Sequence, residues 1–357
     1  MRAVADEEGP LGGTAARLAE YLASGATHGA RVEITFASRA RFATSAGPDA
    51  SLLAAAPTFR WFCTVKAVLA YSLLRLLREA SCGPDTLVCT LVPEYEGDRR
   101  EEVQVGHLLT HSSGLPPYPK PSPTCSLGEA ALTTPVEATP GSTVAYNYCT
   151  AWMIVAHLIE VLSGKEVGAA VERNVFGRLG LRDAALSGRG REDLVARVAS
   201  VAAPGPEERR VAQLTAPDSL AAMAAWNGGL GTLGDLVGVF AHLLRVRCGN
   251  VGDEIDRAVV EDLTTAPERR YDEVLERRVA YANGTIADVS TAGFGRGWSS
   301  DSFGIGGSVL NRPLAAVWAD VERQVACGVM LSGASGKNVI YLQRIASQVR
   351  SDVDAWA

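Results

Sequence analysis

The chain contains 357 residues, of which 47% are hydrophobic and 21% are charged, as in ordinary folded globular proteins. Its formal net charge is −6 and it has no dense cluster of lysines and arginines, so we expect binding neither to nucleic acid nor to a membrane surface. No apolar run approaches the length of about 18 residues that predicts a transmembrane helix.

The cysteines and the opening segment bear on the cellular compartment. The seven cysteines are odd in number and none forms a CxxC pair, which favours free thiols in a reducing environment. The opening segment, MRAVADEEGPLGG, is acidic and then glycine-rich, and it lacks the apolar core of a secretory signal. A cytoplasmic location is therefore expected.

The first part of the chain predicts a helix, two strands and a longer helix. Apolar residues recur at helical spacing over residues 11–27. Residues 31–36 and 40–44 flank a short SRA turn and predict two antiparallel strands. The apolar run VKAVLAYSLLRLL predicts a helix over residues 62–79, which a glycine-proline pair follows.

The middle of the chain is mostly helical, and its last quarter has strand patterns. A long loop rich in serine, proline and threonine spans residues 112–142, and residues 264–290 form a charged, irregular segment typical of a surface excursion. Helices are predicted over residues 150–163, 233–244 and 338–353, and strands around residues 294–299, 304–310, 314–320 and 325–332.

The order of these elements indicates the fold class. Strands near both ends of the chain, with helices between them, favour one antiparallel sheet built from both termini and an inserted helical domain. The predicted class is therefore α+β. We expect residues 1–75 and 285–357 to form the sheet domain, and residues 76–284 to form a helical domain that carries the substrate loops.

The clearest candidate for chemistry is the segment Cys63-Thr64-Val65-Lys66, at the start of the long predicted helix. Residues three apart share a helical face, so the thiol of Cys63 and the amine of Lys66 can meet. A helix N-terminus favours a thiolate, and burial among apolar neighbours disfavours a charged lysine, which could then act as a base. A core cysteine beside an unrelated lysine would give the same short pattern.

Three further segments are suited to chemistry, and each also has a purely structural interpretation. Tyr146, before the helix at 150–163, can be a proton carrier or a packing residue. His107 and His111 have the spacing of a metal-binding pair but lack a third ligand, so we expect no metal and no other cofactor. The glycines within Phe303–Ser308 indicate close approach of a ligand to an edge strand, or a bulge.

Taken together and in this order, these segments resemble the serine β-lactamase and penicillin-binding-protein superfamily, in particular its class C β-lactamase, esterase and transacylase-like branch. The resemblance extends from about residue 30 to about residue 350, and several motifs in the correct order make it specific. Its motifs are HLLTHSSGL (107–115), PGSTVAYNY with the helix AWMIVAHLIEVLSG (140–164), WNGGLGTLGDL (226–236), GFGRGW (293–298), and FGIGGS with WADVERQVACGVMLS (303–332).

The resemblance implies a role for each residue that matches the family's motifs. The family's SxxK motif opens its central helix, and that position reads CTVK here. The resemblance therefore implies that Cys63 is the nucleophile, that Lys66 is the adjacent general base and that Tyr146 is the second proton-transfer group. It also implies an oxyanion hole formed by the backbone N–H groups of Cys63 and Ser308.

Three positions depart from the family pattern. Cysteine replaces the nucleophilic serine. The family's YSN triplet reads Tyr146-Asn147-Tyr148, so its amide side chain is shifted by one residue or lost. The KTG-like triplet reads Ile305-Gly306-Gly307, so its cationic or imidazole group is gone. This last change argues against recognition of the carboxylate of a β-lactam or of a peptide C-terminus.

Because a nucleophile, a base and a second proton carrier all remain, the sequence predicts a cysteine-dependent acyltransferase that works through an acyl-thioester on Cys63. The expected substrates are an amine or alcohol acceptor and a small-molecule acyl donor, with a CoA thioester, an acyl carrier protein or an ester as donor candidates. Intracellular transacylases in this family suggest natural-product biosynthesis, including that of antibiotics. The alternatives are a cysteine-dependent amidase, esterase or thioesterase, and a catalytically inactive binding homologue.

Residues that line the substrate site are expected on the loops at 115–145, 205–228 and 265–300 and on the edge strand. Each of them could instead be a packing or surface residue. The candidates are Tyr118, Asn147, Tyr148, Trp226, Asn227, Arg296, Ile305, Gly306 and Gly307.

Overall fold

The computed structural model describes most of the chain. The described residues are 2–5, 9–24, 29–47, 56–119, 127–199, 209, 212–222, 227–309, 312–333 and 335–356. Of the site residues expected from the sequence, Trp226 lies outside them. None of the helices in the described ranges is both long enough and apolar enough to cross a membrane.

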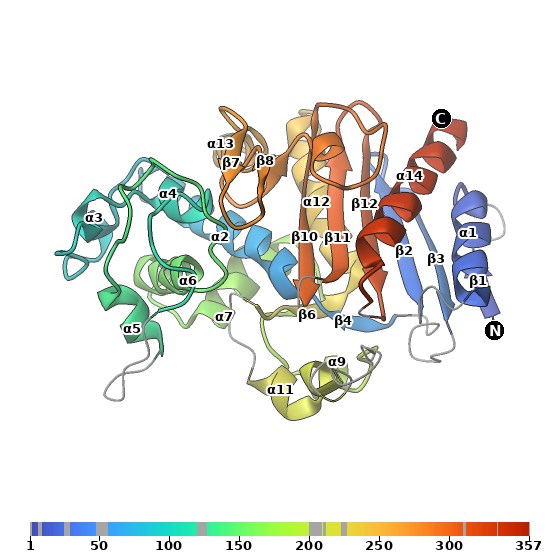
Figure 1. Cartoon of the computed structure of the whole chain (residues 1–357), viewed down its shortest axis with the longest axis horizontal. Helices are drawn as coiled ribbons and strands as arrows, with labels where there is room; N and C mark the ends of the chain where they lie inside the picture. Colours follow the sequence, from blue (N-terminus) through green and yellow to red (C-terminus); the bar gives the residue numbers. More distant parts are fainter. Residues whose placement is uncertain are drawn as a thin grey trace.

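A seven-stranded antiparallel sheet lies at the centre of the fold, and its strands come from both ends of the chain (Figure 1). Their order is β1-β3-β2-β12-β11-β10-β9. The predicted α+β sheet built from both termini is therefore confirmed. The strands are β1 (Arg2–Ala5), β2 (Ala30–Phe36), β3 (Arg41–Gly47), β9 (Ile286–Ala287), β10 (Ser302–Val309), β11 (Arg312–Asp320) and β12 (Val325–Leu331).

Both faces of this sheet are covered, so it separates two hydrophobic cores. Side chains alternate along a strand: in β11, Val317 packs in one core and Trp318 in the other. Helices α1 (Gly12–Ala23) and α14 (Asn338–Trp356) cover one face, and α12 (Leu233–Arg247) covers the other (Figure 1). These helices overlap the predicted segments 11–27, 338–353 and 233–244.

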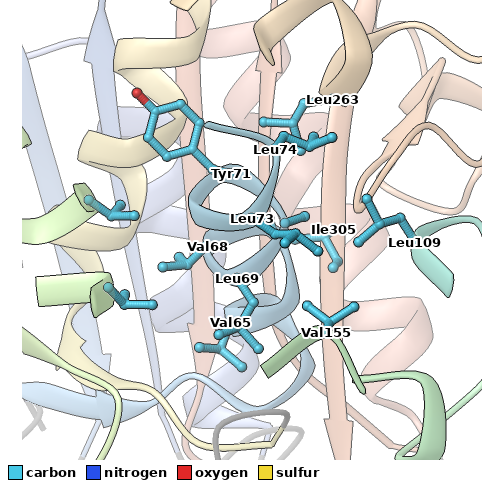
Figure 2. Packing of buried hydrophobic residues seen from close by; sticks show 14 of the residues in the cluster. Val65, Val68, Leu69, Tyr71, Leu73, Leu74, Leu109, Val155, Leu263 and Ile305 are labelled. Atoms are coloured by element: carbon cyan, nitrogen blue, oxygen red, sulfur yellow. The ribbon is translucent and has the colours of Figure 1, made fainter. Parts of the chain in front are cut away.

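Helix α2 (Val65–Glu79) runs between the sheet and the helical layer, and nearly all of its residues are buried. Figure 2 shows Leu69 and Leu73 of α2 near Ile305 of β10 and Val155 of α6. Helix α2 follows the helical turn η1 (Phe62–Thr64), so the predicted helix at 62–79 is confirmed apart from this first turn. A residue at this end of α2 is thereby placed next to the edge of the sheet, where η1 contacts β10 and β11.

The helical layer lies beyond α2, and smaller sheets join it to the centre. Helix α6 (Thr150–Ser163) packs on α2 and coincides with the predicted helix at 150–163. The other elements are α3 (Val88–Leu91), α4 (Val105–Leu109), α5 (Leu127–Thr133), α7 (Val167–Val171), α8 (Gly177–Leu179), α9 (Glu192–Val195), α11 (Pro217–Ala221), α13 (Glu254–Thr264), β4 (Thr58–Arg60), β5 (Ala184–Ala185), β6 (Leu230–Thr232), β7 (Arg270–Asp272) and β8 (Arg277–Val279).

The structure corrects three expectations about individual elements. The predicted strand at 294–299 is not a strand, because glycines at positions 293, 295 and 297 adopt positive φ and break the extended backbone. The predicted loop at 112–142 contains helix α5. The segment at 264–290 is more than a surface excursion: it forms β7, β8 and β9, and it contributes buried residues beside the sheet edge.

The predicted domain boundaries, 1–75 with 285–357 against 76–284, stay a prediction. Helix α12 belongs by that division to the helical domain, yet it packs on strands β2, β11 and β12 of the sheet. It also contributes to the same hydrophobic core as α2 and α6. The sheet and the helical layer are therefore joined by continuous packing.

Candidate active site

Cys63 lies in the helical turn η1, immediately before α2, and its side chain is partly exposed. Two features hold this turn in place. The Thr64 hydroxyl donates a hydrogen bond of 2.6 Å to the carbonyl of Trp61. Phe62 has a φ of +52°, a backbone conformation that residues other than glycine rarely adopt. Its buried ring packs in the core between the sheet and α14 and holds the backbone in this conformation. The backbone around Cys63 is thus set by packing on both sides.

Lys66 is completely buried, and its amine lies between the other two candidate catalytic groups. The Nζ atom is 3.7 Å from Cys63 Sγ and 3.1 Å from the Tyr146 hydroxyl. It also donates to the carbonyl of Tyr148 at 3.2 Å. The structure therefore brings Cys63, Lys66 and Tyr146 together, although they lie on two segments that are far apart in the sequence.

The surroundings of these groups favour their neutral forms. Burial lowers the pKa of Lys66, and the neighbouring Cys63 thiol opposes this shift without cancelling it. Burial raises the pKa of Tyr146 well above its usual range, and the charge of a Cys63 thiolate raises it further. These shifts favour a protonated Tyr146 hydroxyl and weaken the affinity of the Lys66 amine for its proton.

Tyr146 is held by the hairpin of β7 and β8. The buried Asp272 carboxylate accepts hydrogen bonds from the Tyr146 backbone N–H at 3.2 Å and from the Tyr281 hydroxyl at 2.7 Å. Residue Val144 also forms a parallel β-bridge with Asp272. The segment 264–290 thus fixes the loop that carries the tyrosine.

His111 supports the same loop from the other side. Its Nδ1 accepts a hydrogen bond of 3.0 Å from the Asn147 backbone N–H, and its ring lies 4.4 Å from that of Tyr146. Burial lowers the pKa of His111 well below its usual value, and the nearby Lys66 lowers it further. His111 is thus a neutral acceptor. His107 accepts from Gln104 instead, and no group of three metal-ligating side chains occurs in the described ranges.

The two residues after Tyr146 point in different directions. The Asn147 side chain is buried and its amide is fully used, because it donates to the carbonyls of Leu115 and Pro116 and accepts from two backbone N–H groups. Tyr148 lines the cavity beside the site and stacks on the exposed ring of Tyr118 with centroids 5.9 Å apart. Tyr148, rather than Asn147, therefore faces the cavity.

Strand β10 passes directly beside Cys63. A Cβ atom at Gly307 would lie only 3.0 Å from the carbonyl oxygen of Trp61 and 3.4 Å from the backbone nitrogen of Cys63, so glycine permits this approach without displacing the strand. A bulge between Gly307 and Ser308 shifts the pairing with β11. Ser308 is exposed at the edge, whereas the Ile305 side chain is buried and brings no charge to this part of the strand.

A cavity of about 460 Å³ lies along β10 next to this trio. Cys63 and Lys66 do not line this cavity themselves. Their neighbours do: Tyr146, which contacts Lys66, and Gly307, which lies beside Cys63. Its walls are mostly apolar and come from β10, β11, α14 and the segment that follows α13. The lining includes His111, Tyr148, Leu275, Ile286, Phe294, Ile305, Gly306, Gly307, Ser308 and Leu342.

Arg60 is a site residue that the sequence did not single out. It is buried in β4, and it donates to the carbonyl of Leu214 and to Asn227. Burial lowers the pKa of Arg60, and the charge of Cys63 opposes this shift. Asn227 thus accepts hydrogen bonds from Arg60 and does not line the cavity beside Tyr146. Arg296 lines a neighbouring cavity instead.

Asp272, Tyr281 and His111 were also missed as parts of the site. The HLLTHSSGL motif was a signal for His111, although the sequence offered it only as a metal ligand. Nothing in the sequence distinguished Asp272 from the other acidic residues of its charged segment. Its complete burial is visible only in the folded chain.

The fold and this grouping define a class of protein: β-lactamase-fold enzymes that carry out acyl transfer or hydrolysis. The model of the Beta-lactamase family matches residues 15–349, so the chain belongs to that family. A search of the curated proteins found no match.

Solved structures with the same fold cover nearly the whole chain, at low sequence identity. A penicillin-binding protein homologue from Caulobacter crescentus has a TM-score of 0.76 at 18% identity, covering 99% of this chain and 100% of its own. EstCE1, described as a hydrolase with promiscuous acyltransferase activity, has a TM-score of 0.75 at 17% identity, with coverage of 96% and 98%. A LovD6 mutant of simvastatin synthase from Aspergillus terreus has a TM-score of 0.73 at 17% identity, with coverage of 98% and 95%.

Proposed function

We propose that the protein is a cysteine-dependent acyltransferase that carries its acyl group as a thioester on Cys63. The observation that carries this proposal is the position of the Lys66 amine, 3.7 Å from the Cys63 thiol and 3.1 Å from the Tyr146 hydroxyl. Burial of a lysine without a compensating charge costs free energy. A catalytically inactive homologue would gain nothing that offsets this cost, so the buried amine favours an active enzyme.

The first half-reaction follows from these positions. Lys66 takes the proton of the Cys63 thiol, and the sulfur attacks the carbonyl carbon of the donor. The backbone N–H groups of Cys63 and Ser308 stabilise the oxyanion. The bond between the acyl carbon and the leaving group then breaks, and the leaving group receives its proton from Lys66 through Tyr146.

The second half-reaction reverses these steps with an acceptor. Tyr146 and Lys66 take the proton of an amine or alcohol as it attacks the thioester carbon. The new C–N or C–O bond forms, the C–S bond breaks, and the proton returns to the Cys63 sulfur. No oxidant, metal or cofactor is needed for either half-reaction.

Two observations support transfer: one argues against hydrolysis and the other against β-lactam turnover. The cavity beside the trio is walled mainly by apolar side chains, such as Phe294 and Leu342, which disfavour water. Ile305 offers no charge for the carboxylate of a β-lactam. A role in natural-product biosynthesis is proposed from the likeness in fold to simvastatin synthase, and a reducing cytoplasm would keep the thiol free.

Intact-mass measurement tests the proposal. The protein is incubated with short acyl N-acetylcysteamine thioesters, and we expect a single acyl adduct that is lost in Cys63→Ala and kept in the matched control Cys149→Ala. Amines and alcohols are then added, and transfer requires that they discharge the adduct faster than water does. Discharge by water alone would indicate the hydrolase. Absence of an adduct, with Cys63 no more reactive toward iodoacetamide than the other thiols, would indicate an inactive homologue.

A further inference from the structure

A second cavity adjoins the apolar one, between α1, the loop after β9 and α14. Its volume is about 810 Å³, and the two cavities share Arg277, Gly293 and Gln343. A Cβ atom at Gly293 would lie 3.4 Å from the Gln343 amide nitrogen and 3.5 Å from Arg277 Nη1, so these two donors flank the junction. The two cavities therefore lie side by side at these three residues.

The charge of this second cavity is opposite to that of the chain as a whole. Four arginines line it, Arg17, Arg277, Arg296 and Arg344, while its described lining contains no aspartate or glutamate. The chain carries a net charge of −6. A concave surface lined by one sign of charge concentrates the field and attracts ligands of the opposite sign.

Most of these arginines have donors to spare. Arg277 donates to one backbone carbonyl, that of Ala292. The side chains of Arg296 and Arg344 form no hydrogen bond or ion pair with any residue in the described ranges, and only Arg17 is paired, with Glu20. Guanidinium groups match phosphate oxygens in pairs of parallel hydrogen bonds, so this set suits a phosphorylated ligand.

An independent observation points to a ligand at the same place. Tyr21 of α1 also lines the second cavity, and it is only 5% exposed. Its hydroxyl has no hydrogen-bond partner among the residues that the structure describes, although buried hydroxyl groups are normally paired. A bound ligand would supply that partner.

We propose that the second cavity binds the phosphorylated arm of the acyl donor, and that the donor is an acyl phosphopantetheine thioester, either as acyl-CoA or on a carrier protein. The proposal rests on the proposed function, because it names the donor of the same Cys63. The apolar cavity holds the acyl end and the thioester, and the arginines hold the phosphates. In the transfer, the Cys63–acyl bond forms as the thioester C–S bond breaks, and the phosphopantetheine thiol leaves with the proton from Lys66.

Binding of CoA to the Cys63→Ala protein tests the site without any chemistry. Isothermal titration calorimetry is carried out with CoA, dephospho-CoA and pantetheine. Two proteins are compared: Cys63→Ala alone, and Cys63→Ala that also carries both Arg296→Gln and Arg344→Gln. We expect the double variant to weaken CoA binding at least tenfold and to leave the weak pantetheine binding unchanged. The control is Arg257→Gln, which removes an exposed arginine of α13 that lines neither cavity and donates to the carbonyl of Gly252.

The rate of Cys63 acylation provides a second readout. Matched acetyl, butyryl and octanoyl groups are offered as CoA, phosphopantetheine and N-acetylcysteamine thioesters. We expect the double arginine variant and added salt to slow the phosphorylated donors at least tenfold and the neutral donor little. If phosphopantetheine donors match CoA donors, a carrier protein is the indicated source of the arm; a clear advantage for CoA indicates the free thioester.

The outcomes separate the two proposals. Acylation by the neutral thioester, with CoA binding and acylation unaffected by the arginine changes, overturns the donor site and leaves the proposed function standing. CoA binding that depends on the arginines, with no acylation by any donor, supports the anion site and overturns the proposed function. If neither arginine-dependent CoA binding nor acylation is observed, both the donor site and the proposed function are excluded.

Discussion

The Lys66 amine lies 3.1 Å from the Tyr146 hydroxyl, in a completely buried position where its other hydrogen-bond partners are the Cys63 thiol and backbone carbonyls. None of the salt bridges in the described part of the chain involves Lys66. Because no carboxylate compensates its charge, burial dominates and its pKa is lowered. This relationship favours the neutral amine over the charged form, as the proposed role of Lys66 as a base requires.

The first prediction concerns Lys66 itself. Lys66→Met should slow acylation of Cys63 by about a hundred- to ten-thousandfold, the usual loss when a general base is removed. Lys66→Arg should not restore the rate, because arginine keeps its proton. Stopped-flow or quenched intact-mass measurements of acylation give the rate, and circular dichroism checks the fold.

The pH dependence of the same reaction follows from the lowered pKa of Lys66. Below that pKa the amine is protonated and cannot accept the thiol proton, so the acylation rate should rise with pH. The rise should be centred below the value of about 10.4 that an ordinary lysine shows. A rate that is unchanged by Lys66→Met over this range would contradict the assignment.

The second prediction is the order in which the thiols react. Burial raises the pKa of Cys149 to about 11, and it raises the pKa of Cys327 well above its usual range. Only thiolates are good nucleophiles, so both should stay unmodified near neutral pH while Cys63, partly exposed beside Lys66, reacts first. Peptide mapping after brief iodoacetamide treatment measures this order. Early labelling of Cys149 would argue against it.

The contact between Cys63 and Lys66 was predictable from the sequence, because both lie on one helix and helical geometry is local. The position of Tyr146 beside them followed only from the resemblance to a family, since 80 residues separate it from Lys66. The sheet built from both termini was predictable because its strands alternate and their order along the chain is simple. Residues 294–299 gave a false strand signal, because apolar Phe294 and Trp298 alternate with glycines whose positive φ prevents extension.

The surroundings of the trio could not be predicted, because they depend on burial and on contacts between distant segments. Asp272 lies in a charged segment that suggests exposure, yet the folded chain covers it completely. Arg60 is similar: a single arginine between two aromatic residues carries no periodicity, and its partners are more than 150 residues away. Asn147 shows the reverse case, where a motif suggested substrate binding and the fold uses the amide for backbone hydrogen bonds.

The third prediction tests the approach of β10 to Cys63. In Gly307→Ala the new methyl group would lie 3.0 Å from the Trp61 carbonyl oxygen and 3.2 Å from Phe62 Cβ, so the strand must move away by a few tenths of an ångström. We expect acylation to slow by about ten- to a hundredfold, because oxyanion donors act only when well aligned. Gly306→Ala is the control, since its methyl group would lie 3.7 Å from its nearest neighbour. Equal acylation rates for the two variants would mean that the close approach of β10 to Cys63 does not contribute to the reaction.

The fourth prediction concerns the hairpin that holds Tyr146. Tyr281→Phe removes the 2.7 Å hydrogen bond to the buried Asp272 carboxylate, which also anchors the Tyr146 backbone. Hydrogen bonds to charged groups contribute about 1.5–3 kcal/mol, so the free energy of unfolding should fall by about that amount. The exposed Tyr271 of the same hairpin offers a matched control, because Tyr271→Phe removes a hydroxyl that no hydrogen bond uses within the described residues.

The kinetic effect of Tyr281→Phe distinguishes positioning from plain stability. A looser Tyr146 should lower the rate of acylation at saturating donor and leave the donor concentration for half-saturation nearly unchanged, since Tyr281 holds the proton carrier through Asp272. Urea unfolding and saturation kinetics measured at one temperature give both quantities. Loss of stability with an unchanged rate would mean that Asp272 and Tyr281 serve the fold alone, and that the Tyr146 loop keeps its place through His111 and its own packing.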